Sequence, residues 1–456
     1  MAAGRTRVVV VGGGLAGITA ALDCIDAGAD VTVLESRGWL GGLTHSFRRH
    51  GLWVDNGQHV FLRCCTAYRG LLDRLGVAHL VTLQDRLDVP VASGDSGQVS
   101  RLRRSGLPAP LHLGAALARY RWLEPAERLR AARAALGLKR IDVDDPATDK
   151  RSFGSWLGEH GQSPRSLEAL WDLIGIATLN APAAEASLAL GAVVFQQGVL
   201  GSASAGDIGW ANAPLRRLHG DAATDVLERE GAQVRTRARV RALRRHDDRW
   251  SVAVDGGSVE ADAVVLAVPP VVAEDLLPEG AIGPDPGWSF RLGASPIVNL
   301  HVVYDRTVLS EPFLAAVDSP LQWVFDRTGP SGLQRGQYVA VSVSAADDLV
   351  DLPTAQVRDR LLPALSDLLR RAGAARVEDV FVTRERQATF RCRPGTASIR
   401  PGAATGLPGL ALAGAWTATG WPATMEGAVR SGHTAVAHLL RNPVRSGGAR
   451  VQEVVA

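Results

Sequence analysis

Short hydrophobic runs and amphipathic stretches alternate at the start of the chain. Val8–Val11 is a continuous run of valines, which is typical of a strand buried on both faces. Glycines follow, then a stretch with helical spacing, then a second hydrophobic run at Val31–Leu34. This order of strand, turn, helix and strand predicts a parallel βαβ unit and therefore an α/β fold.

The hydrophobic period places further elements along the chain. We expect strands at 87–102 (with a break), 233–240, 250–254, 263–268, 297–304, 323–326, 338–344 and 409–413, and helices at 67–76, 107–140, 153–157, 166–176, 182–195, 215–231, 355–372 and 426–440. Residues 207–214 show neither period and are predicted to form a loop. The strands beyond residue 297 predict a second, mixed domain.

Composition and charge narrow the class of protein. The chain has 456 residues, of which 46% are hydrophobic and 21% charged, as in globular proteins of two or three domains. Its net charge of +3 is small, which argues against nucleic-acid binding. No hydrophobic run reaches the ~18 residues of a transmembrane helix, and the few residues before Val8 leave no room for a signal peptide. We expect a cytoplasmic protein, with any membrane contact peripheral and on the inner face of the cell membrane.

Cysteine usage agrees with that location. The four cysteines are Cys24, Cys64, Cys65 and Cys392, and none has the spacing of metal ligands. Cys24 falls inside the first predicted helix, where a small apolar side chain suits a core. We therefore predict reduced thiols and no metal site.

The first βαβ unit carries a dinucleotide-binding pattern. Gly12, Gly14 and Gly17 form G-x-G-x-x-G between the first strand and the first helix. Gly12 permits the tight turn, Gly14 lets a pyrophosphate approach the backbone, and Gly17 allows close packing of helix on strand. Leu15 and Ala16 then begin a helix whose N-terminus attracts phosphate charge.

An acid stands where this pattern requires one. Glu35 ends the second strand, roughly 20 residues beyond the glycines, where a carboxylate binds a ribose hydroxyl. Ser36 and Arg37 follow it, and then a second glycine pair, Gly41 and Gly42. Such a pair next to the ribose acid predicts a loop that passes close to a diphosphate.

Three longer stretches carry a family resemblance. After the elements above comes Asp55-Asn-Gly-Gln-His59, and later come 170–180 (LWDLIGIATLN) and 413–432 (AGAWTATGWPATMEGAVRSG). Together they resemble the FAD-dependent amine oxidase and phytoene desaturase superfamily, and within it the squalene-associated branch, the hydroxysqualene dehydroxylase family.

The resemblance implies a two-dinucleotide-binding, Rossmann-like FAD domain, a mixed α+β substrate domain and a helical cap. It divides the chain into FAD-domain segments 1–85, 215–285 and 385–442, substrate and cap segments 86–214 and 286–384, and a loose tail at 443–456. The substrate would be a long-chain isoprenoid, hydroxysqualene, and an electron donor that the sequence does not identify would supply reducing power.

FAD is the implied cofactor. The residues expected to contact it are Gly12, Gly14, Leu15, Ala16, Gly17, Glu35, Ser36, Arg37, Gly41, Gly42, Leu43, Gly57, Gln58, His59, Val240, Pro269, Gly414, Ala415, Ala423, Thr424 and Met425. In the resembling family the backbone near Thr424 and Met425 begins a helix that faces the pyrimidine end of the flavin. The dipole of that helix favours the negative charge that reduced flavin develops there.

Two positions depart from the family pattern. Relatives commonly carry an acid at position 415 and an arginine at position 43, whereas this chain has Ala415 and Leu43. Both changes remove polar contacts to the cofactor, so we expect FAD to bind weakly. The family's amine oxidases also hold a lysine near the flavin, and residues 283–300 contain none. This argues against amine oxidation, although Trp416 and Trp421 could still form an aromatic cage.

The implied reaction replaces an allylic hydroxyl by hydrogen, and a poor leaving group needs an acid. His59 is the first candidate because it follows the glycine that the family places beside the flavin, and histidine titrates in a suitable range. A structural histidine bonded to the backbone is the alternative. Asp55 and Asp207 are the other candidate acids.

Two questions stay open at the level of sequence. Leucine, tryptophan and arginine are interleaved over 107–140, so this stretch either lies on an anionic membrane or turns its arginines to water. The alternative functions are a carotenoid or phytoene-type desaturase, an amine oxidase-like flavoenzyme, and a flavin-binding scaffold without turnover.

Overall fold

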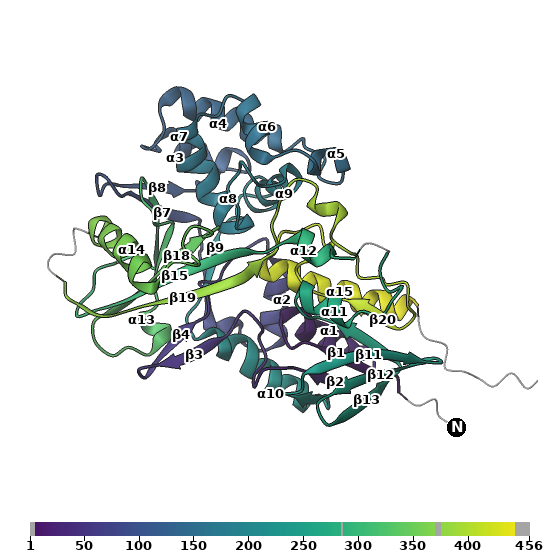
Figure 1. Cartoon of the computed structure of the whole chain (residues 1–456). Helices are drawn as coiled ribbons and strands as arrows, with labels where there is room; N and C mark the ends of the chain where they lie inside the picture. Colours follow the sequence, from purple (N-terminus) through teal and green to yellow (C-terminus); the bar gives the residue numbers. More distant parts are fainter. Residues whose placement is uncertain (1–4, 284–285, 370–374, 443–456) are drawn as a thin grey trace, which may run out of the picture.

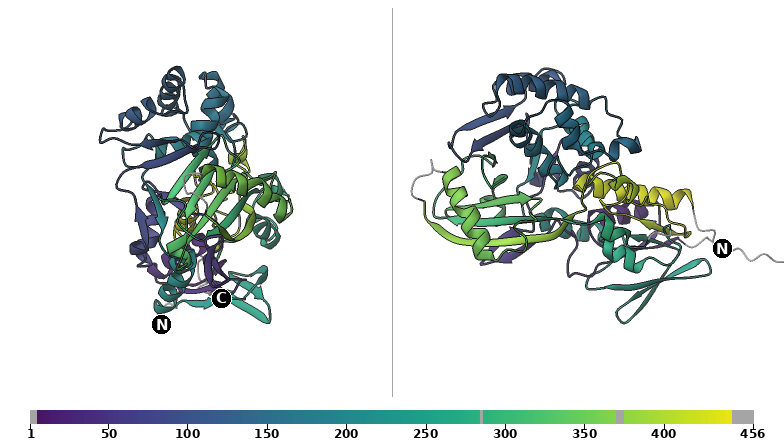
Figure 2. Two further views of the ribbon diagram at one scale, coloured as in Figure 1. Left: turned by 90° about the vertical axis from the view of Figure 1, so that its left-hand side faces the viewer. Right: turned by 45° about the horizontal axis from the view of Figure 1, so that its top comes forward.

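The computed structural model describes residues 5–283, 286–369 and 375–442, so the predicted loose tail lies outside the described residues. Figure 1 shows three regions: a nucleotide-binding part around β1 and α1, a large sheet around β15 and β18, and a cap of helices above both. The two further views place the cap on one side of the molecule and the β11–β13 meander on the opposite side (Figure 2).

A five-stranded parallel sheet forms the centre of the nucleotide-binding part. Its spatial order is β10 (Gln233–Arg235), β2 (Asp30–Leu34), β1 (Arg7–Val11), β14 (Ala263–Leu266) and β20 (Leu410–Leu412). The central strand β1 is buried over all four of its valines, as a parallel strand covered on both faces should be. The predicted α/β fold with a parallel sheet is therefore confirmed.

Helices from the two ends and the middle of the chain surround this sheet (Figure 1). They are α1 (Leu15–Asp26), α2 (Thr66–Arg74), α10 (Ala222–Arg229), α11 (Pro270–Leu276), α12 (Trp288–Leu292) and α15 (Met425–Arg441). Helix α15 packs directly on α1 because Gly432 has no side chain. A Cβ at that position would lie 2.6 Å from the carbonyl oxygen of Ala16 and 2.8 Å from Cβ of Thr19.

The second, mixed domain contains a seven-stranded sheet. Its order is β19 (Val377–Thr389), β15 (Ser295–Tyr304), β18 (Gln337–Ser344), β17 (Trp323–Asp326), β16 (Phe313–Val317), β7 (Asp88–Ser93) and β8 (Val99–Arg103). One face packs on α14 (Thr354–Leu368) through alternate residues such as Val298, Leu300 and Val341. The other face is turned toward the cap and the nucleotide-binding part.

The cap consists of short helices between residues 111 and 198. They are α3 (Gly114–Ala118), α4 (Pro125–Leu138), α5 (Pro146–Asp149), α6 (Phe153–Glu159), α7 (Pro164–Ser166), α8 (Asp172–Leu179) and α9 (Leu188–Gly198). Helix α9 begins at Leu188, after Ser187 caps it, and not at Pro182 as predicted. Residues 182–186 form a turn in which Ala186 N–H donates to the carbonyl of Pro182.

Residues 207–214 do not form the predicted loop. They contain β9 (Ile208–Ala211), the central strand between β5 (Val60–Leu62) and β6 (Val81–Leu83). Gly209 is needed there, because a Cβ would lie 2.3 Å from the ring of Phe61. The strand is too short to show a period, and its partners come from a distant part of the chain.

The predicted strand at 233–240 is split between two sheets. β10 ends at Arg235, Arg237 adopts a positive φ of 55°, and β11 (Val240–His246) begins a meander with β12 (Arg249–Val254) and β13 (Gly257–Ala261). The turn is held by Ala238 N–H, which donates to the carbonyl of Glu35. Strands β3 (Ser46–Arg49) and β4 (Leu52–Asp55) pair with each other as a separate antiparallel hairpin.

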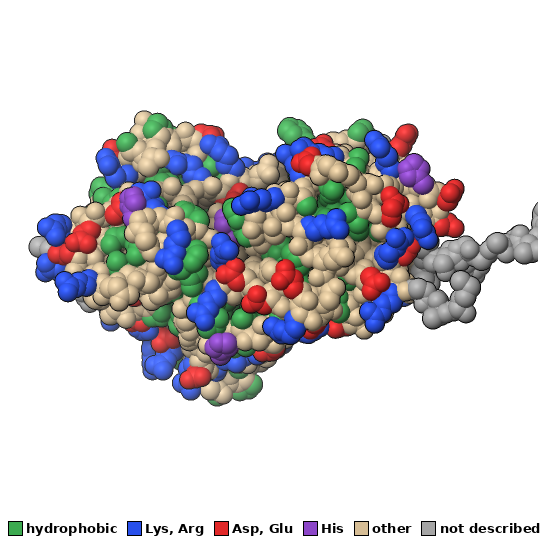
Figure 3. Space-filling model, turned by 90° about the horizontal axis from the view of Figure 1, so that it is seen from below, with side chains coloured by type: hydrophobic (Ala, Val, Ile, Leu, Met, Phe, Trp, Pro, Cys, Tyr) green, Lys and Arg blue, Asp and Glu red, His purple; other side chains and the backbone are tan. Residues whose placement is uncertain are grey.

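Charged side chains are mixed over the surface. Seen from below, arginine and lysine side chains are interspersed with aspartate and glutamate (Figure 3). This face offers no extended basic surface, which agrees with the small net charge of the chain. The four cysteines are free thiols.

Two fully buried histidines make the fold sensitive to acid. Tyr68 Oη lies 2.9 Å from Nε2 of His219, and Tyr338 Oη lies 2.7 Å from Nδ1 of His301. Burial lowers the pKa of His219 to about 4 and that of His301 to about 3. Between these values and the ordinary 6.5, protons bind the unfolded chain and not the folded one, so stability falls as pH falls.

We expect the free energy of unfolding, measured with urea, to drop between pH 7.5 and pH 5 by about 2 kcal/mol for each of these histidines. His301→Gln should be less sensitive to pH by that amount. The exposed His50 provides a control, and His50→Gln should keep the wild-type slope. A His301→Gln protein with the wild-type slope would contradict the assignment.

Candidate active site

One large cavity lies where the three regions meet. Its volume is about 1350 Å³. Its wall includes residues of the nucleotide-binding part, the seven-stranded sheet and the cap. Pockets for a single small ligand usually measure ~300–1,000 Å³, so this one has room for a dinucleotide and a second long molecule.

The N-terminus of α1 opens into the cavity. Gly14 is the N-cap and no side chain accepts from the first turn, so the amide groups there are available to an anion. A Cβ on Gly14 would have no neighbour nearer than 3.9 Å, whereas one on Gly42 would lie 2.9 Å from Cα of Gly14. The two glycines therefore face each other across a space that side chains would fill.

Gly12 and Gly17 have packing roles. A Cβ on Gly17 would lie 1.9 Å from the carbonyl oxygen of Gly12, and one on Gly12 would lie 2.3 Å from that of Ala267. Gly17 does not line the cavity. It brings the helix close to the strand, as the sequence predicted, but it is not placed to touch a ligand.

Glu35 is held at the end of β2 with its carboxylate on the cavity wall. Its Oε2 accepts from the N–H of Gly13 at 2.8 Å, and its Oε1 accepts from the N–H of Arg37 at 2.7 Å and from Oγ of Ser36 at 3.1 Å. These bonds fix the carboxylate at the place where the ribose of a dinucleotide is expected.

The N-terminus of α15 reaches the same cavity from the other end of the chain. Thr424 caps the helix by accepting from the N–H of Gly427 at 3.1 Å. The preceding loop is held by Arg400, which sequence analysis missed. Its buried guanidinium donates to the carbonyls of Ala415 and Trp416, each at 3.2 Å, and of Thr417. Arg400 lies 15 to 17 residues before these carbonyl groups, so the sequence gives no local signal for this contact.

Most of the predicted cofactor residues therefore share one wall. Those that line the cavity are Gly12, Gly14, Leu15, Ala16, Glu35, Ser36, Arg37, Gly41, Gly42, Leu43, Gly57, Gln58, His59, Val240, Pro269, Gly414, Ala415, Ala423, Thr424 and Met425. Two helix N-termini, a ribose acid and a glycine-lined gap fit an anionic dinucleotide. Among the described residues, no group of three or more His, Cys, Asp or Glu side chains is placed to hold a metal ion.

Asp55 is not placed as a catalytic acid. Its buried carboxylate does not line the cavity. It accepts from Arg327 at 2.5 Å, from Oγ of Ser46 at 2.6 Å and from the N–H of Leu215 at 3.1 Å. These contacts join the β3–β4 hairpin, the start of the α10 segment and the end of β17, so the carboxylate has a structural role.

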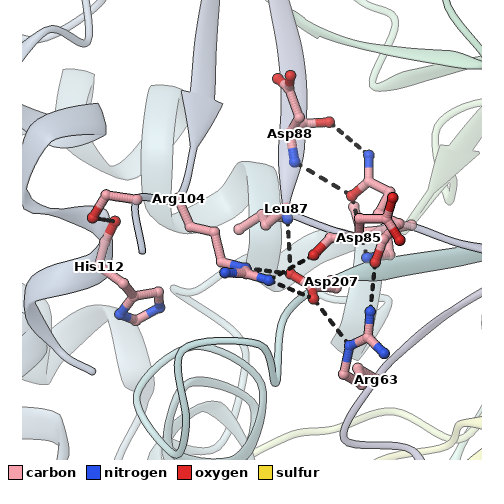
Figure 4. Close-up of polar contacts among 10 residues, drawn as sticks. Arg63, Asp85, Leu87, Asp88, Arg104, His112 and Asp207 are labelled. Carbon is pink, nitrogen blue, oxygen red and sulfur yellow. Dashed lines mark hydrogen bonds and ion pairs between the residues drawn. The ribbon is translucent and has the colours of Figure 1, made fainter. Parts of the chain in front are cut away.

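Asp207 is likewise part of an ion-pair network and not of the cavity wall (Figure 4). Its fully buried carboxylate accepts from Nε of Arg104 at 2.6 Å, from Nε of Arg63 at 3.0 Å and from the N–H of Leu87 at 2.7 Å. These bonds to the charged form lower the pKa of Asp207 despite its burial. An ionised carboxylate with this many partners has no proton to give.

His59 does line the cavity, beside Gly57 and Gln58. Burial lowers its pKa to about 4, and the carboxylate of Asp55, which acts in the opposite direction, does not restore it. The imidazole is therefore neutral near pH 7. A neutral imidazole can donate a hydrogen bond but is a poor source of a proton.

Sequence analysis missed a polar part of the cavity wall. Asn299, Ser342 and Glu385 lie on the cavity side of the seven-stranded sheet, on β15, β18 and β19. Asn299 stands out in the run Ser295–Tyr304, where it interrupts an apolar strand, and that signal could have identified it. Nothing in the sequence brings Glu385 next to it.

The remaining wall is largely apolar. The cap contributes Leu113, Leu117, Leu136, Ile174, Val194 and Phe195, and the α11–α12 region contributes Val271, Val272 and Phe290. The nucleotide cradle and this apolar region form one continuous space. A long hydrocarbon and a dinucleotide can therefore lie in contact.

Comparison with known proteins agrees with this geometry. The family model described as flavin containing amine oxidoreductase matches residues 15–440. The chain is 29% identical to a hydroxysqualene dehydroxylase of Sinorhizobium fredii, over 94% of this chain and 97% of that protein. It is 24% identical to a probable zeta-carotene desaturase of Synechococcus elongatus, over 95% of this chain and 98% of that one.

A solved structure shares the fold. Cyclohexylamine oxidase from Brevibacterium oxydans superposes with a TM-score of 0.69 at 20% identity, covering 96% of this chain and 99% of the other. The family match spans most of the chain, and the cradle described above has the shape that its cofactor requires. The chain therefore belongs to the flavin containing amine oxidoreductase family and is an FAD-dependent oxidoreductase of the hydroxysqualene dehydroxylase type.

Proposed function

We propose that this protein replaces the hydroxyl group of hydroxysqualene by hydrogen and so forms squalene. The observation that carries the proposal is the single cavity in which a dinucleotide cradle continues into an apolar channel. The similarity to hydroxysqualene dehydroxylases over nearly the whole chain supports the choice of lipid.

The residues of the cradle would hold FAD at both ends. The amide groups at the start of α1 and Gly14 would bind the pyrophosphate, Glu35 the ribose, and the start of α15 at Thr424 and Met425 the flavin end. When bound and reduced, the flavin supplies a hydride. Ala415 and Leu43 offer no polar side chain here, so FAD should be easily lost.

The protein contributes placement and exclusion of water. The leucine, isoleucine and phenylalanine side chains of the cap would bind the hydrocarbon chain and keep bulk water from the reacting carbon. Loss of hydroxide from an allylic carbon leaves a cation, and a dry site lets fixed dipoles act on that charge strongly.

Amine oxidation is less well supported. The chain has two lysines, Lys139 and Lys150, and neither lines the cavity. Trp416 packs on Trp288 with ring centroids 5.2 Å apart and donates its indole N–H to the carbonyl of Val268 at 2.9 Å. Both Trp416 and Trp421 line the cavity, but the indole of Trp416 is held by these contacts, and no ring contact between Trp416 and Trp421 is found among the described residues.

A desaturase is the second candidate, because the same cavity suits a carotenoid precursor and a zeta-carotene desaturase is among the relatives. A desaturase removes hydrogen from its lipid and reduces the flavin, which is the opposite direction of electron flow. A flavin-binding scaffold would do neither. Product analysis separates the three.

The exposed face of α4 supports peripheral membrane contact. Leu129 and Leu136 are 54% and 49% exposed, and the exposed Arg133 lies on the same helical stripe, while Arg140 is exposed just beyond the end of the helix. Leu136 also lines the cavity, so this face adjoins the channel. Within the described part of the chain, no helix combines the length and apolar character that crossing a bilayer requires. We propose that α4 lies on an anionic membrane and takes lipid from it.

The reaction can be tested under anaerobic conditions. We expect protein with chemically reduced FAD to convert hydroxysqualene to squalene, seen by mass spectrometry, with one flavin reoxidised per squalene formed. Phytoene added to the oxidised protein should leave the flavin oxidised. Flavin reduction by phytoene, with no squalene from hydroxysqualene, would favour the desaturase, and no reaction of either lipid would favour the scaffold.

The cradle can be tested separately from turnover. Gly14→Val should weaken FAD binding at least ~100-fold, because its side chain would occupy the pyrophosphate space, while its Cβ would come no nearer than 3.9 Å to a protein atom, Cα of Gly42. Flavin absorbance after gel filtration measures binding, and circular dichroism checks the fold. Gly70→Val on α2, where an added Cβ meets nothing within 4 Å, is the matched control and should keep the wild-type FAD content. Wild-type FAD content in Gly14→Val would refute the assignment.

Membrane contact can be tested by flotation with vesicles that contain anionic phospholipid. The double variant Leu129→Asp, Leu136→Asp should reduce vesicle binding about 10-fold or more. Each change removes apolar area that the membrane would bury and adds a negative charge that the anionic phospholipid repels. Leu440→Asp on α15, which is 59% exposed, should bind as the wild type does. Equal vesicle binding by the wild type, the double variant and Leu440→Asp would show that α4 is not the membrane-binding surface.

A further inference from the structure

The wall of the cavity formed by the seven-stranded sheet carries a strip of polar side chains. The pairing register places Asn299 of β15 beside Ser342 of β18 and Thr383 of β19. In the next row Ile297 lies between Ser344 and Glu385. Of these, Asn299, Ser342, Ser344 and Glu385 line the cavity. We call these four residues the polar strip.

The polar strip is not required by the packing of the sheet. The residues that alternate with it, among them Val298, Leu300, Val341 and Val343, face α14 and form an apolar core there. Burying polar groups in the wall of an apolar cavity costs free energy unless they find partners. Their presence on the ligand side therefore points to a ligand that has a polar group of its own.

Asn299 shows what kind of group that is. Its side chain is fully buried, its Nδ2 donates to Oγ1 of Thr383 at 3.4 Å, and its Oδ1 has no hydrogen-bond partner. Thr383 in turn lies 2.9 Å from Nε2 of His301, which fixes the amide from behind. An amide oxygen left without a donor is ready to accept one O–H.

Three carboxylates line the cavity, and two of them are fully engaged. Glu35 is bonded as described above. Glu426 accepts from the N–H groups of Ala67 and Tyr68 and from Arg430 at 2.7 Å. Both therefore serve the architecture of the site.

Glu385 is different from these two. It accepts from Nδ2 of Asn56 at 3.2 Å and from the N–H of Gln387 at 3.3 Å, and in the described part of the chain no arginine or lysine forms an ion pair with it. The partner Asn56 directly precedes Gly57, where the chain is expected to pass the flavin. Glu385 thus combines a place beside the reacting region with a carboxyl group that is not neutralised by a cation.

We propose that the polar strip binds the hydroxyl group of the lipid alcohol, and that Glu385 is the catalytic residue that protonates it. This rests on the proposed function. Asn299 Oδ1 accepts the hydroxyl hydrogen and turns an oxygen lone pair toward Glu385. The proton of Glu385 moves to that oxygen, the carbon–oxygen bond breaks, and water leaves with both bonding electrons.

The balance of the step is complete. A hydride from the reduced cofactor forms the new carbon–hydrogen bond, so the lipid gains two electrons and the cofactor loses them. Glu385 regains its proton from solvent when the product leaves, so one proton is consumed for each molecule of water formed. A lipid in the cavity keeps bulk water from the reacting groups, so the transferred proton stays between Glu385 and the lipid oxygen.

The assignment explains why the other candidates fail. Asp55 and Asp207 are ion-paired away from the cavity, and His59 is neutral on its wall. Glu385 lines the cavity, which Asp55 and Asp207 do not, and it is part of the polar strip. His59 can still donate a hydrogen bond to the bound lipid alcohol or cofactor.

The first test is a single turnover with Glu385→Gln, compared with the wild type and with Glu378→Gln, an exposed residue on the same strand. Reduced protein is mixed with hydroxysqualene or with its acetate ester, and flavin reoxidation is followed. We expect Glu385→Gln to slow the alcohol by ~100-fold or more, because general acids contribute about 10²–10⁴-fold. The ester, whose leaving group needs no proton, should slow less than about 5-fold.

Equal slowing of alcohol and ester, or no slowing of either, would overturn the role of Glu385. His59→Gln should slow the alcohol and the ester equally. If His59→Gln instead shows the selective loss, histidine is the acid and the proposal is wrong.

The second test does not depend on turnover. Binding of hydroxysqualene and of squalene to the oxidised protein is measured by quenching of tryptophan fluorescence. The wild type and Glu378→Gln should prefer the alcohol, and Asn299→Leu should lose about 5- to 10-fold of that preference. Hydroxysqualene can fail to reoxidise the reduced wild-type protein while the oxidised protein still binds hydroxysqualene more tightly than squalene. In that case the proposed function fails and the polar strip stands. An unchanged preference in Asn299→Leu would overturn the strip.

Discussion

The contact between α1 and α15 determines where the site lies. These helices begin more than 400 residues apart, and Gly432 lets the backbone of one rest against the backbone of the other at Ala16. Because the helices share this contact and both begin at the cavity, two sets of unpaired amide groups point into one space. An anionic dinucleotide can bridge the two helix N-termini, because it has a charged pyrophosphate in its middle and polar rings at its ends.

Most buried carboxylates around that space form ion pairs that hold segments of the protein together. Asp55 pairs with Arg327, Asp207 with Arg63 and Arg104, and Glu426 with Arg430. Each pair joins segments that are distant in sequence, apart from the last, which lies within α15. A buried carboxylate without such partners would be very costly, so most acids near the cavity are already committed. Among the described residues, neither Glu35 nor Glu385 has such a cation partner. Glu35 accepts three hydrogen bonds from its neighbours, whereas Glu385 accepts two and lines the cavity as part of the polar strip.

The seven-stranded sheet separates two kinds of environment. Its outer face packs α14 with valine and leucine, and its inner face presents asparagine, serine and glutamate to an otherwise apolar cavity. A period of two residues along each strand is enough to create this division. The proposed lipid alcohol would match this division, since its hydrocarbon would contact the cap and its hydroxyl group would meet the sheet.

The sequence alone determined the local features of this protein. The run Val8–Val11 and the glycines after it specify their own strand and turn, and Glu35 is recognisable as the acid at the end of the second strand, because each depends on neighbours within about 30 residues. The same local reasoning failed for β9, whose hydrogen-bond partners come from β5 and β6, and for the two halves of 233–240, which join different sheets. Local reasoning also named Asp55 and Asp207 as candidate acids, because residue type does not show whether an arginine from a distant segment pairs with the carboxylate. Only the tertiary structure decided which carboxylates pair with arginine and which of them line the cavity, since ion pairing and burial are set by segments far apart in the chain.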